Sequence, residues 1–278
     1  MIGAMPQIAA LQMVSTPDVD RNLAAAGRLI AEAADAGVRL AALPEYFCLL
    51  GRSDRDKLLI AEADGSGPIQ DFLAEQARRH RLWLIGGTLP IRGGDEQHVR
   101  NSCLVYGPDG RRVARYDKIH LFAYDNGRER YDEGRVLEAG GEPVAFEADL
   151  DGDGRAWRVG LSVCYDLRFP ELYRRLMAPA PCDILAVPSA FTHTTGQAHW
   201  ELLLRSRAVE NQCYVLAPAQ GGLHENGRCT WGHSLVADPW GELLACQAEG
   251  EAVVSAAADV ERLAQVRQQL PALAHRRI

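Results

Sequence analysis

The sequence predicts an α/β fold in which two β-sheets pack face to face and helices cover their outer surfaces. Ten extended apolar segments recur along the 278 residues, which is more strand than one open sheet comfortably holds. Helical patterns lie between several of these segments and favour parallel pairing. Two short turns, GPDGRR at 107–112 and DPWGEL at 238–243, instead join neighbouring strands and indicate hairpins.

The expected strands are runs rich in aliphatic and β-branched residues. In chain order they cover residues 8–14, 38–46, 82–90, 101–108, 111–122, 158–165, 183–191, 213–220, 232–239 and 251–259.

Four helices are expected between these strands. The first spans 21–36, with Asp20 as its N-cap and Gly37 as its stop signal, and the second spans 68–80 and opens on Pro68. The other two run from Pro170 to about Met177 and from Gln197 to Asn211. In the last helix, an apolar stripe at helical spacing predicts a core or subunit-interface face, and it consists of Trp200, Leu203, Leu204 and Ala208.

Composition indicates one globular domain over residues 1–278, because no linker, low-complexity segment or repeat interrupts the chain. Hydrophobic residues make up 47% and supply a sizeable core. A formal charge of −7 argues against nucleic acid as a partner. No leader or apolar span is apparent, so we expect no membrane association and a cytoplasmic location. Seven cysteines without a Cys-x-x-Cys pair argue against zinc and a disulfide framework.

Three chemically different side chains occupy similar places in the pattern. Glu45 closes the run RLAALPEYF, Lys118 lies within RYDKIHLF, and Cys164 ends VGLSV. Taken singly, a solvated carboxylate, an edge-strand lysine and a packing cysteine are the simpler interpretations. Taken together, they match a chemical need, because strand ends are where clefts form in α/β sheets.

A thiol with an ordinary pKa of about 8.5 is mostly protonated at neutral pH, so a nucleophilic cysteine needs a base or a cationic neighbour. Glu45 can be that base and Lys118 the cation. The lysine ammonium and a backbone N–H of the turn after Cys164 can also stabilise the negative charge that develops when sulfur attacks a carbonyl or nitrile carbon. This chemistry requires neither a metal nor another cofactor.

The stretches LPEYF, YDKIHLF and SVCYDLRFPELYR, in this order, resemble the three signature blocks of the nitrilase superfamily, the carbon–nitrogen hydrolases. The similarity spans nearly the whole chain. It implies a four-layer α-β-β-α sandwich, usually as a dimer or larger assembly. It also implies that Glu45 is the general base, that Lys118 stabilises the tetrahedral intermediate, and that Cys164 forms a thioester acyl-enzyme.

Family members carry a second glutamate after the lysine, in a frame of aromatic-x-Glu-Ser. Here YDEG supplies Tyr131 and Glu133 but places Gly134 where serine is common, and Glu129 in the same loop is a rival. The carboxylate is expected to hold Lys118 and to help position the substrate nitrogen. The alternative is that this charged stretch is only a solvated loop.

Several neighbouring side chains are candidates for substrate binding. Tyr165 follows the cysteine, and Phe191 with Thr192 follows the strand at 183–191, where they can touch the acyl group. His120 either lines the cleft or packs, and packing is the preferred interpretation. Arg168 either pairs with Asp166 to stiffen the turn, which is preferred narrowly, or binds a substrate carboxylate.

Cys48 is expected to pack, and the scattered histidines show no metal-binding pattern; they include His199, His224 and His233.

The motif frames most resemble the Nit-like branch of the superfamily. This resemblance implies an amidohydrolase that cleaves a small, anionic amide with release of ammonia. Deaminated glutathione amidase is the first expectation and ω-amidase on 2-oxo acid amides the second, with carbamoylase or nitrilase behind them. Lys118 with Arg128, Arg130 or Arg168 can attract an anionic substrate. A noncatalytic binding protein of the same fold predicts a damaged Glu-Lys-Cys set, whereas all three residues are present.

Overall fold

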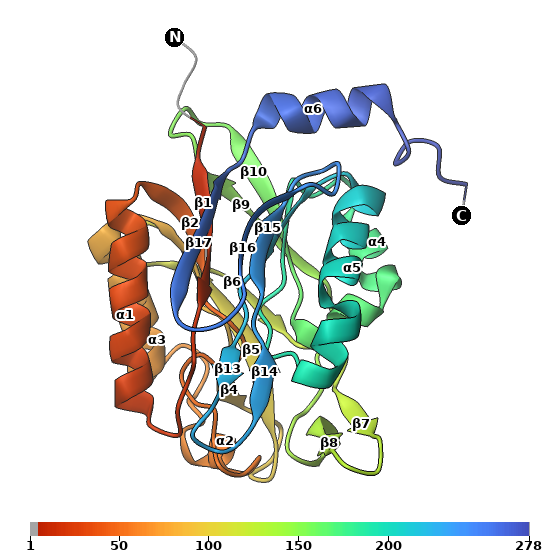
Figure 1. The fold of residues 1–278 in the computed structure, drawn as a ribbon. Coiled ribbons are helices and arrows are strands. Elements are labelled where there is room, and N and C mark those ends of the chain that lie inside the picture. Colours follow the sequence, from red (N-terminus) through yellow and green to blue (C-terminus); the bar gives the residue numbers. More distant parts are fainter. Residues whose placement is uncertain (1–4, 278) are drawn as a thin grey trace.

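Two β-sheets lie face to face in the computed structural model, which describes residues 5–277 (Figure 1). The first sheet has the order β17-β1-β2-β3-β5-β4, with β6 paired to β5. Its strands are β1 (Gln7–Gln12), β2 (Val38–Ala42), β3 (Trp83–Ile85), β4 (Leu89–Arg92), β5 (Val99–Tyr106), β6 (Arg112–Asp117) and β17 (Ala252–Ala257). The helix-linked neighbours β1, β2 and β3 pair in parallel, as expected.

The second sheet has the order β16-β15-β12-β11-β10-β9. Its strands are β9 (Val144–Asp149), β10 (Ala156–Leu161), β11 (Ile184–Ala186), β12 (Tyr214–Ala217), β15 (Ser234–Ala237) and β16 (Leu243–Gln247). The strands β10, β11 and β12 are parallel, whereas β15 and β16 form the antiparallel hairpin that the turn at 238–243 predicts. Two small hairpins form separate two-stranded sheets: β7 (Ala123–Asp125) with β8 (Arg130–Asp132), and β13 (Gly221–Leu223) with β14 (Cys229–Trp231).

Helices cover the outer face of each sheet, which gives the four-layer sandwich (Figure 1). The helices α1 (Val19–Asp35) and α3 (Pro68–His80) lie on the first sheet, and α4 (Pro170–Leu176) and α5 (His193–Asn211) lie on the second. On α1 the buried residues recur at helical spacing and define the face that meets the sheet; they are Ala25, Ala26, Leu29, Ile30 and Ala33. The short helix α2 (Asp56–Leu59) and the late helix α6 (Val260–Gln269) were not expected.

The main core lies between the two sheets, where side chains from both inner faces interdigitate. It contains fully buried Ile8 and Leu40 from the first sheet and Trp157 and Leu216 from the second. A second core fills the space between the first sheet and its helices, with Ile30 and Leu73 facing Leu84. Within residues 5–277, no helix combines the length and apolar character that crossing a membrane requires.

Several expected boundaries were wrong for identifiable reasons. The N-cap of α1 is Asp18, whose carboxylate accepts from the N–H of Arg21, so Asp20 lies in the first turn. The helix α5 begins at His193 because Thr192 caps it, four residues before the expected start at Gln197. The segment 82–90 contains β3 and the start of β4. The strands expected over 38–46, 111–122 and 158–165 end before Glu45, Lys118 and Cys164, respectively. The domain predicted over 1–278 also includes residues 1–4 and 278, which lie outside the described residues.

Candidate active site

Glu45, Lys118 and Cys164 lie in the segments that follow β2, β6 and β10, and the fold brings all three together at one end of the two sheets. All three are buried, with exposed fractions of 1%, 1% and 8%. Cys164 has a φ of 49°, a left-handed backbone conformation that is uncommon for residues other than glycine. It opens the short 3-10 helix η2 (Cys164–Arg168), so the sulfur is carried on a sharp turn between strand and helix.

Lys118 is held between two carboxylates. Its Nζ donates to Glu45 Oε1 at 2.8 Å and to Glu133 Oε1 and Oε2 at 3.0 and 2.8 Å. Burial alone would lower the pKa of Lys118, but the charges of Glu133 and Glu45 outweigh it and raise that pKa well above its ordinary value. The lysine is therefore an ammonium ion at neutral pH.

Glu133, and not its rival Glu129, occupies the second carboxylate position. Its Oε1 also accepts from the Tyr46 hydroxyl at 2.8 Å, and its Oε2 accepts from the N–H of Phe122 at 2.7 Å. Glu129 instead accepts from Thr194 Oγ1 at the surface, at 2.9 Å. A Cβ at Gly134 would make only an ordinary contact, so the missing serine leaves the placement of Glu133 undisturbed.

The Glu45 carboxylate is oriented from three sides. Besides Lys118, its Oε1 accepts from Asn101 Nδ2 at 2.9 Å, and its Oε2 accepts from the N–H of Ala190 at 3.0 Å. Sequence reasoning missed both contacts, because they join segments 56 and 145 residues away along the chain. With its oxygens fixed in this way, the carboxylate can receive a proton in only a narrow range of directions.

The pKa of the Cys164 thiol is raised well above its ordinary value, first by burial and then by the negative charge of Glu45. Lys118 lowers it, but Glu133 adds a second opposing negative charge. The expected cation is therefore present but is neutralised by two carboxylates. Cys164 consequently rests as a thiol, and a thiol acts as a nucleophile only when a base removes its proton.

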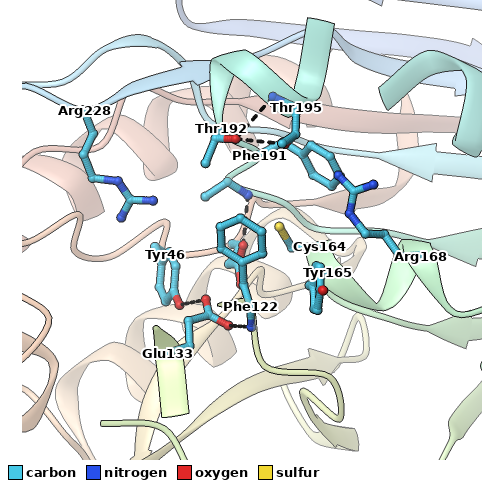
Figure 2. Close-up of a pocket in the computed structure, with 12 residues that line it drawn as sticks. Tyr46, Phe122, Glu133, Cys164, Tyr165, Arg168, Phe191, Thr192, Thr195 and Arg228 are labelled. Carbon is cyan, nitrogen blue, oxygen red and sulfur yellow. Dashed lines mark hydrogen bonds between the residues drawn. The ribbon is translucent and has the colours of Figure 1, made fainter. Parts of the chain in front are cut away.

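The Cys164 thiol borders a cavity (Figure 2). The predicted Tyr165, Arg168, Phe191 and Thr192 line it together with Glu45, Glu133 and Cys164. The remaining lining residues were not predicted, and they are Tyr46, Phe122, Ala190, Thr195 and Arg228. Phe122 is the last residue of the YDKIHLF block and Tyr46 follows Glu45 within LPEYF, so these two motifs could have indicated both residues.

His120 does not line this cavity, so its place among the expected substrate-binding residues was wrong and its packing interpretation holds. Its ring stacks on Phe169 with centroids 3.7 Å apart, and its Nδ1 lies 2.7 Å from Asp166 Oδ1. Asp166 is fully buried and also accepts from the Tyr116 hydroxyl and from the N–H of Val163, which precedes Cys164.

The preferred pairing of Asp166 with Arg168 is also wrong, because the carboxylate oxygens of Asp166 are hydrogen-bonded to His120, Tyr116 and Val163. The Arg168 guanidinium instead lies over the Phe191 ring, 5.4 Å from its centroid, at the cavity. Cys48 packs as expected, and burial raises its pKa to about 12.

We expect Glu133 to contribute to acid unfolding. Burial acts to raise its pKa, but Lys118 outweighs this and lowers it. Because the folded pKa lies below the unfolded value of about 4.3, the stabilisation is present above that pH and is lost as pH falls through the folded pKa. Glu133→Gln should therefore reduce the slope of unfolding free energy against pH between pH 5 and 3 by up to about 1.4 kcal/mol per unit.

Urea denaturation at each pH measures this slope, with Glu129→Gln as the matched control. The control should keep the wild-type slope because Glu129 contacts Thr194 and not Lys118. Equal slopes for the Glu133 variant and wild type would show that the Lys118–Glu133 pair does not shift the titration.

Fold and cavity together define a class of protein. A buried thiol and a fixed carboxylate line a cavity in an α-β-β-α sandwich, and a buried ammonium ion is bonded to that carboxylate. This set suits hydrolysis of a carbon–nitrogen bond through attack by sulfur. The family model for carbon-nitrogen hydrolases matches residues 7–268, and the chain belongs to this family. It is an amidohydrolase that acts on C–N bonds.

Two curated relatives and one solved structure are similar to this chain over most of their length. The chain is 41% identical to a deaminated glutathione amidase of Synechocystis sp. over 96% of this chain and 97% of that one. It is 39% identical to the Homo sapiens deaminated glutathione amidase over 98% of this chain and 83% of that one. A Saccharomyces cerevisiae member of branch 10 of the nitrilase superfamily superposes with a TM-score of 0.85 at 29% identity, covering 100% and 99% of the two chains.

Proposed function

We propose that this protein hydrolyses deaminated glutathione, with Cys164 as nucleophile, Glu45 as general base and Lys118 as the stabiliser of the developing negative charge. The observation that carries the proposal is the convergence of Glu45, Lys118 and Glu133 through bonds of 2.8–3.0 Å beside a thiol that opens into the cavity. The names of the relatives supply the substrate.

In the proposed reaction, Glu45 takes the thiol proton as the sulfur attacks the amide carbon. The Lys118 ammonium and a backbone N–H after Cys164 stabilise the oxyanion. Protonated Glu45 then gives its proton to the leaving nitrogen, and the C–N bond breaks to leave a thioester. Water, deprotonated by Glu45, hydrolyses the thioester and restores the thiol. Glu133 holds Lys118 in position throughout.

The leaving group depends on the amide. Deaminated glutathione is joined through secondary amides, so its hydrolysis to 2-oxoglutarate releases the amine of cysteinylglycine, whereas ammonia leaves only from a primary amide such as 2-oxoglutaramate. An ammonia assay alone therefore does not detect the favoured reaction.

Arg168 is the proposed partner for the substrate carboxylate. Its guanidinium lies at the cavity and forms no ion pair with an Asp or Glu among residues 5–277. A cation that lacks a carboxylate partner in the protein can pair with one from the substrate, and a guanidinium does so through two parallel hydrogen bonds.

A product panel followed by mass spectrometry tests the proposal. The compounds are deaminated glutathione, 2-oxoglutaramate, an N-carbamoyl amino acid, a simple aliphatic amide and a nitrile. We expect kcat/KM to be highest for deaminated glutathione, with 2-oxoglutarate and cysteinylglycine formed in equal amounts. A preference for 2-oxoglutaramate would assign an ω-amidase instead, and absence of turnover for all five compounds would contradict the amidase assignment.

We place the protein in the cytoplasm as a homodimer whose subunits each consist of one catalytic domain. All seven cysteines are free, which suits a reducing compartment.

The proposed dimer interface lies beside α5. Leu202, Val209 and Trp240 are large, exposed and apolar, and they border one groove there. Sedimentation equilibrium should give twice the chain mass, and Leu202→Asp should shift it toward the monomer; a monomeric wild type would exclude the dimer. Cell fractionation tests the location.

A further inference from the structure

Two arginines face the cavity from opposite sides of Cys164 (Figure 2). Arg168 belongs to the helix that starts at the cysteine, and Arg228 belongs to the loop between β13 and β14. Among residues 5–277, neither guanidinium pairs with a carboxylate, although the chain carries a net charge of −7. One substrate carboxylate can occupy one of them, which leaves the other without an assigned role.

The loop that carries Arg228 is anchored to the segment that follows Glu45. Asn226 Nδ2 donates to the carbonyl oxygen of Gly51 at 2.6 Å, and Asn226 Oδ1 accepts from the N–H of Arg228 at 3.0 Å. The buried His224 fastens the base of the loop to the carbonyl oxygen of Ser15 at 2.8 Å. Arg228 is therefore presented by a fixed turn and not by a free loop.

The Arg228 side chain is directed toward the site. Its guanidinium lies 5.2 Å from the centroid of the Tyr131 ring, at the cavity and on the same side as Tyr46. Arg168 lies at the other side, against the rings of Tyr165 and Phe191. When a carbonyl carbon is bound at the Cys164 sulfur, its acyl chain and its nitrogen extend in different directions. Each of these two groups therefore extends toward one arginine.

The two sides differ in how they suit the two parts of an amide. The acyl part stays attached to sulfur until water arrives, and Arg168, four residues from Cys164 and packed on two aromatic rings, is placed to hold it. The amine part must leave first, and Arg228 lies on a surface turn whose neighbours Glu225 and Gly227 are exposed. This exposure suits the Arg228 side to departure of the amine.

We infer that Arg228 binds a carboxylate carried by the leaving amine, so that the preferred substrate is an amide with one carboxylate on each side of the scissile bond. The inference rests on the proposed function and deepens it. It explains how an amine as large as a dipeptide is selected over ammonia, because ammonia carries no group for Arg228.

The test compares two substrates that differ only at this carboxylate: deaminated glutathione and its C-terminal carboxamide. A charge-assisted hydrogen bond is worth about 10- to 100-fold in affinity, so wild type should favour the acid by about that factor in kcat/KM, mainly through KM. Arg228→Met should bring the ratio of the two substrates close to one, and Arg228→Lys should restore part of it. Arg168→Met should lower kcat/KM for both substrates and keep the ratio.

A ratio that is the same in wild type and Arg228→Met would overturn the inference, and a ratio lost in Arg168→Met instead would reverse the assignment of the two sides. Equilibrium binding of both compounds to Cys164→Ala, with and without Arg228→Met, separates this inference from the proposed function. An acid preference in binding that depends on Arg228 supports the carboxylate site even if turnover fails. Turnover without any such preference retains the amidase and removes the site.

Discussion

Cys164→Ala is expected to lower kcat on deaminated glutathione by at least about 10⁴-fold, because loss of a nucleophile removes the covalent route and leaves only binding and oxyanion stabilisation. The fold should persist, since the change removes one sulfur atom beside the cavity. Product formation measured by mass spectrometry, together with the thermal unfolding midpoint, separates a chemical effect from a folding effect.

Cys213→Ala is the matched control for that experiment. Cys213 is also a buried cysteine, but it belongs to the main core and does not line the cavity. Its replacement should cost some stability and leave kcat near the wild-type value. Similar losses of kcat in both variants, or retained activity in Cys164→Ala, would remove Cys164 from the role of nucleophile.

Lys118→Met is expected to affect both activity and stability. It keeps most of the volume of the lysine side chain but leaves the buried Glu45 and the largely buried Glu133 as neighbouring carboxylates with no cation between them. Breaking a buried pair in this way costs about 3–5 kcal/mol in the free energy of unfolding. The loss of oxyanion stabilisation should lower kcat by about 10²–10³-fold.

The stability loss should depend on pH in a particular direction. Without Lys118, burial raises the folded pKa of Glu133 above the unfolded value of about 4.3. Its protonated form then favours the folded state, so the variant should be most stable below that pH and lose stability as pH rises through the raised pKa. Urea denaturation between pH 4 and 8 measures this.

The double variant Lys118→Met with Glu133→Gln supplies the control, because removing one charge should recover part of the stability without recovering activity. If Lys118→Met were as stable as wild type at pH 8, the three charges would not form the coupled buried group that the distances indicate.

The sheets, and the proximity of Glu45, Lys118 and Cys164, could be predicted from the sequence because each signal is local. Apolar runs predict buried strands, and Glu45, Lys118 and Cys164 are each a polar or reactive group next to such a run. Contacts between segments that are distant in the sequence have no such local signal. Asn101 reaches Glu45 from β5, and Arg228 reaches the cavity through a turn between two strands of three residues each.

The incorrect predictions have the same cause, because local sequence signals do not show contacts between distant segments. Asp166 and Arg168 are two residues apart and invited a local pairing, but Asp166 is oriented by Tyr116 from the opposite sheet. The hairpin of β7 and β8 is polar and short, so periodicity did not indicate it, although it precedes Glu133 directly. The reactive side chains could therefore be predicted from the sequence, whereas the residues that contact them could be identified only from the structure.

Peptide mass spectrometry of acid-quenched wild-type enzyme tests the central claim most directly. Enzyme and deaminated glutathione are mixed in equal amounts and quenched at intervals through one turnover. The account predicts that the peptide containing Cys164 transiently carries the mass of the 2-oxoglutaryl group and that no other peptide does. Substrate-derived mass on a different residue, or an unmodified Cys164 peptide at every interval combined with undiminished turnover by Cys164→Ala, would contradict it.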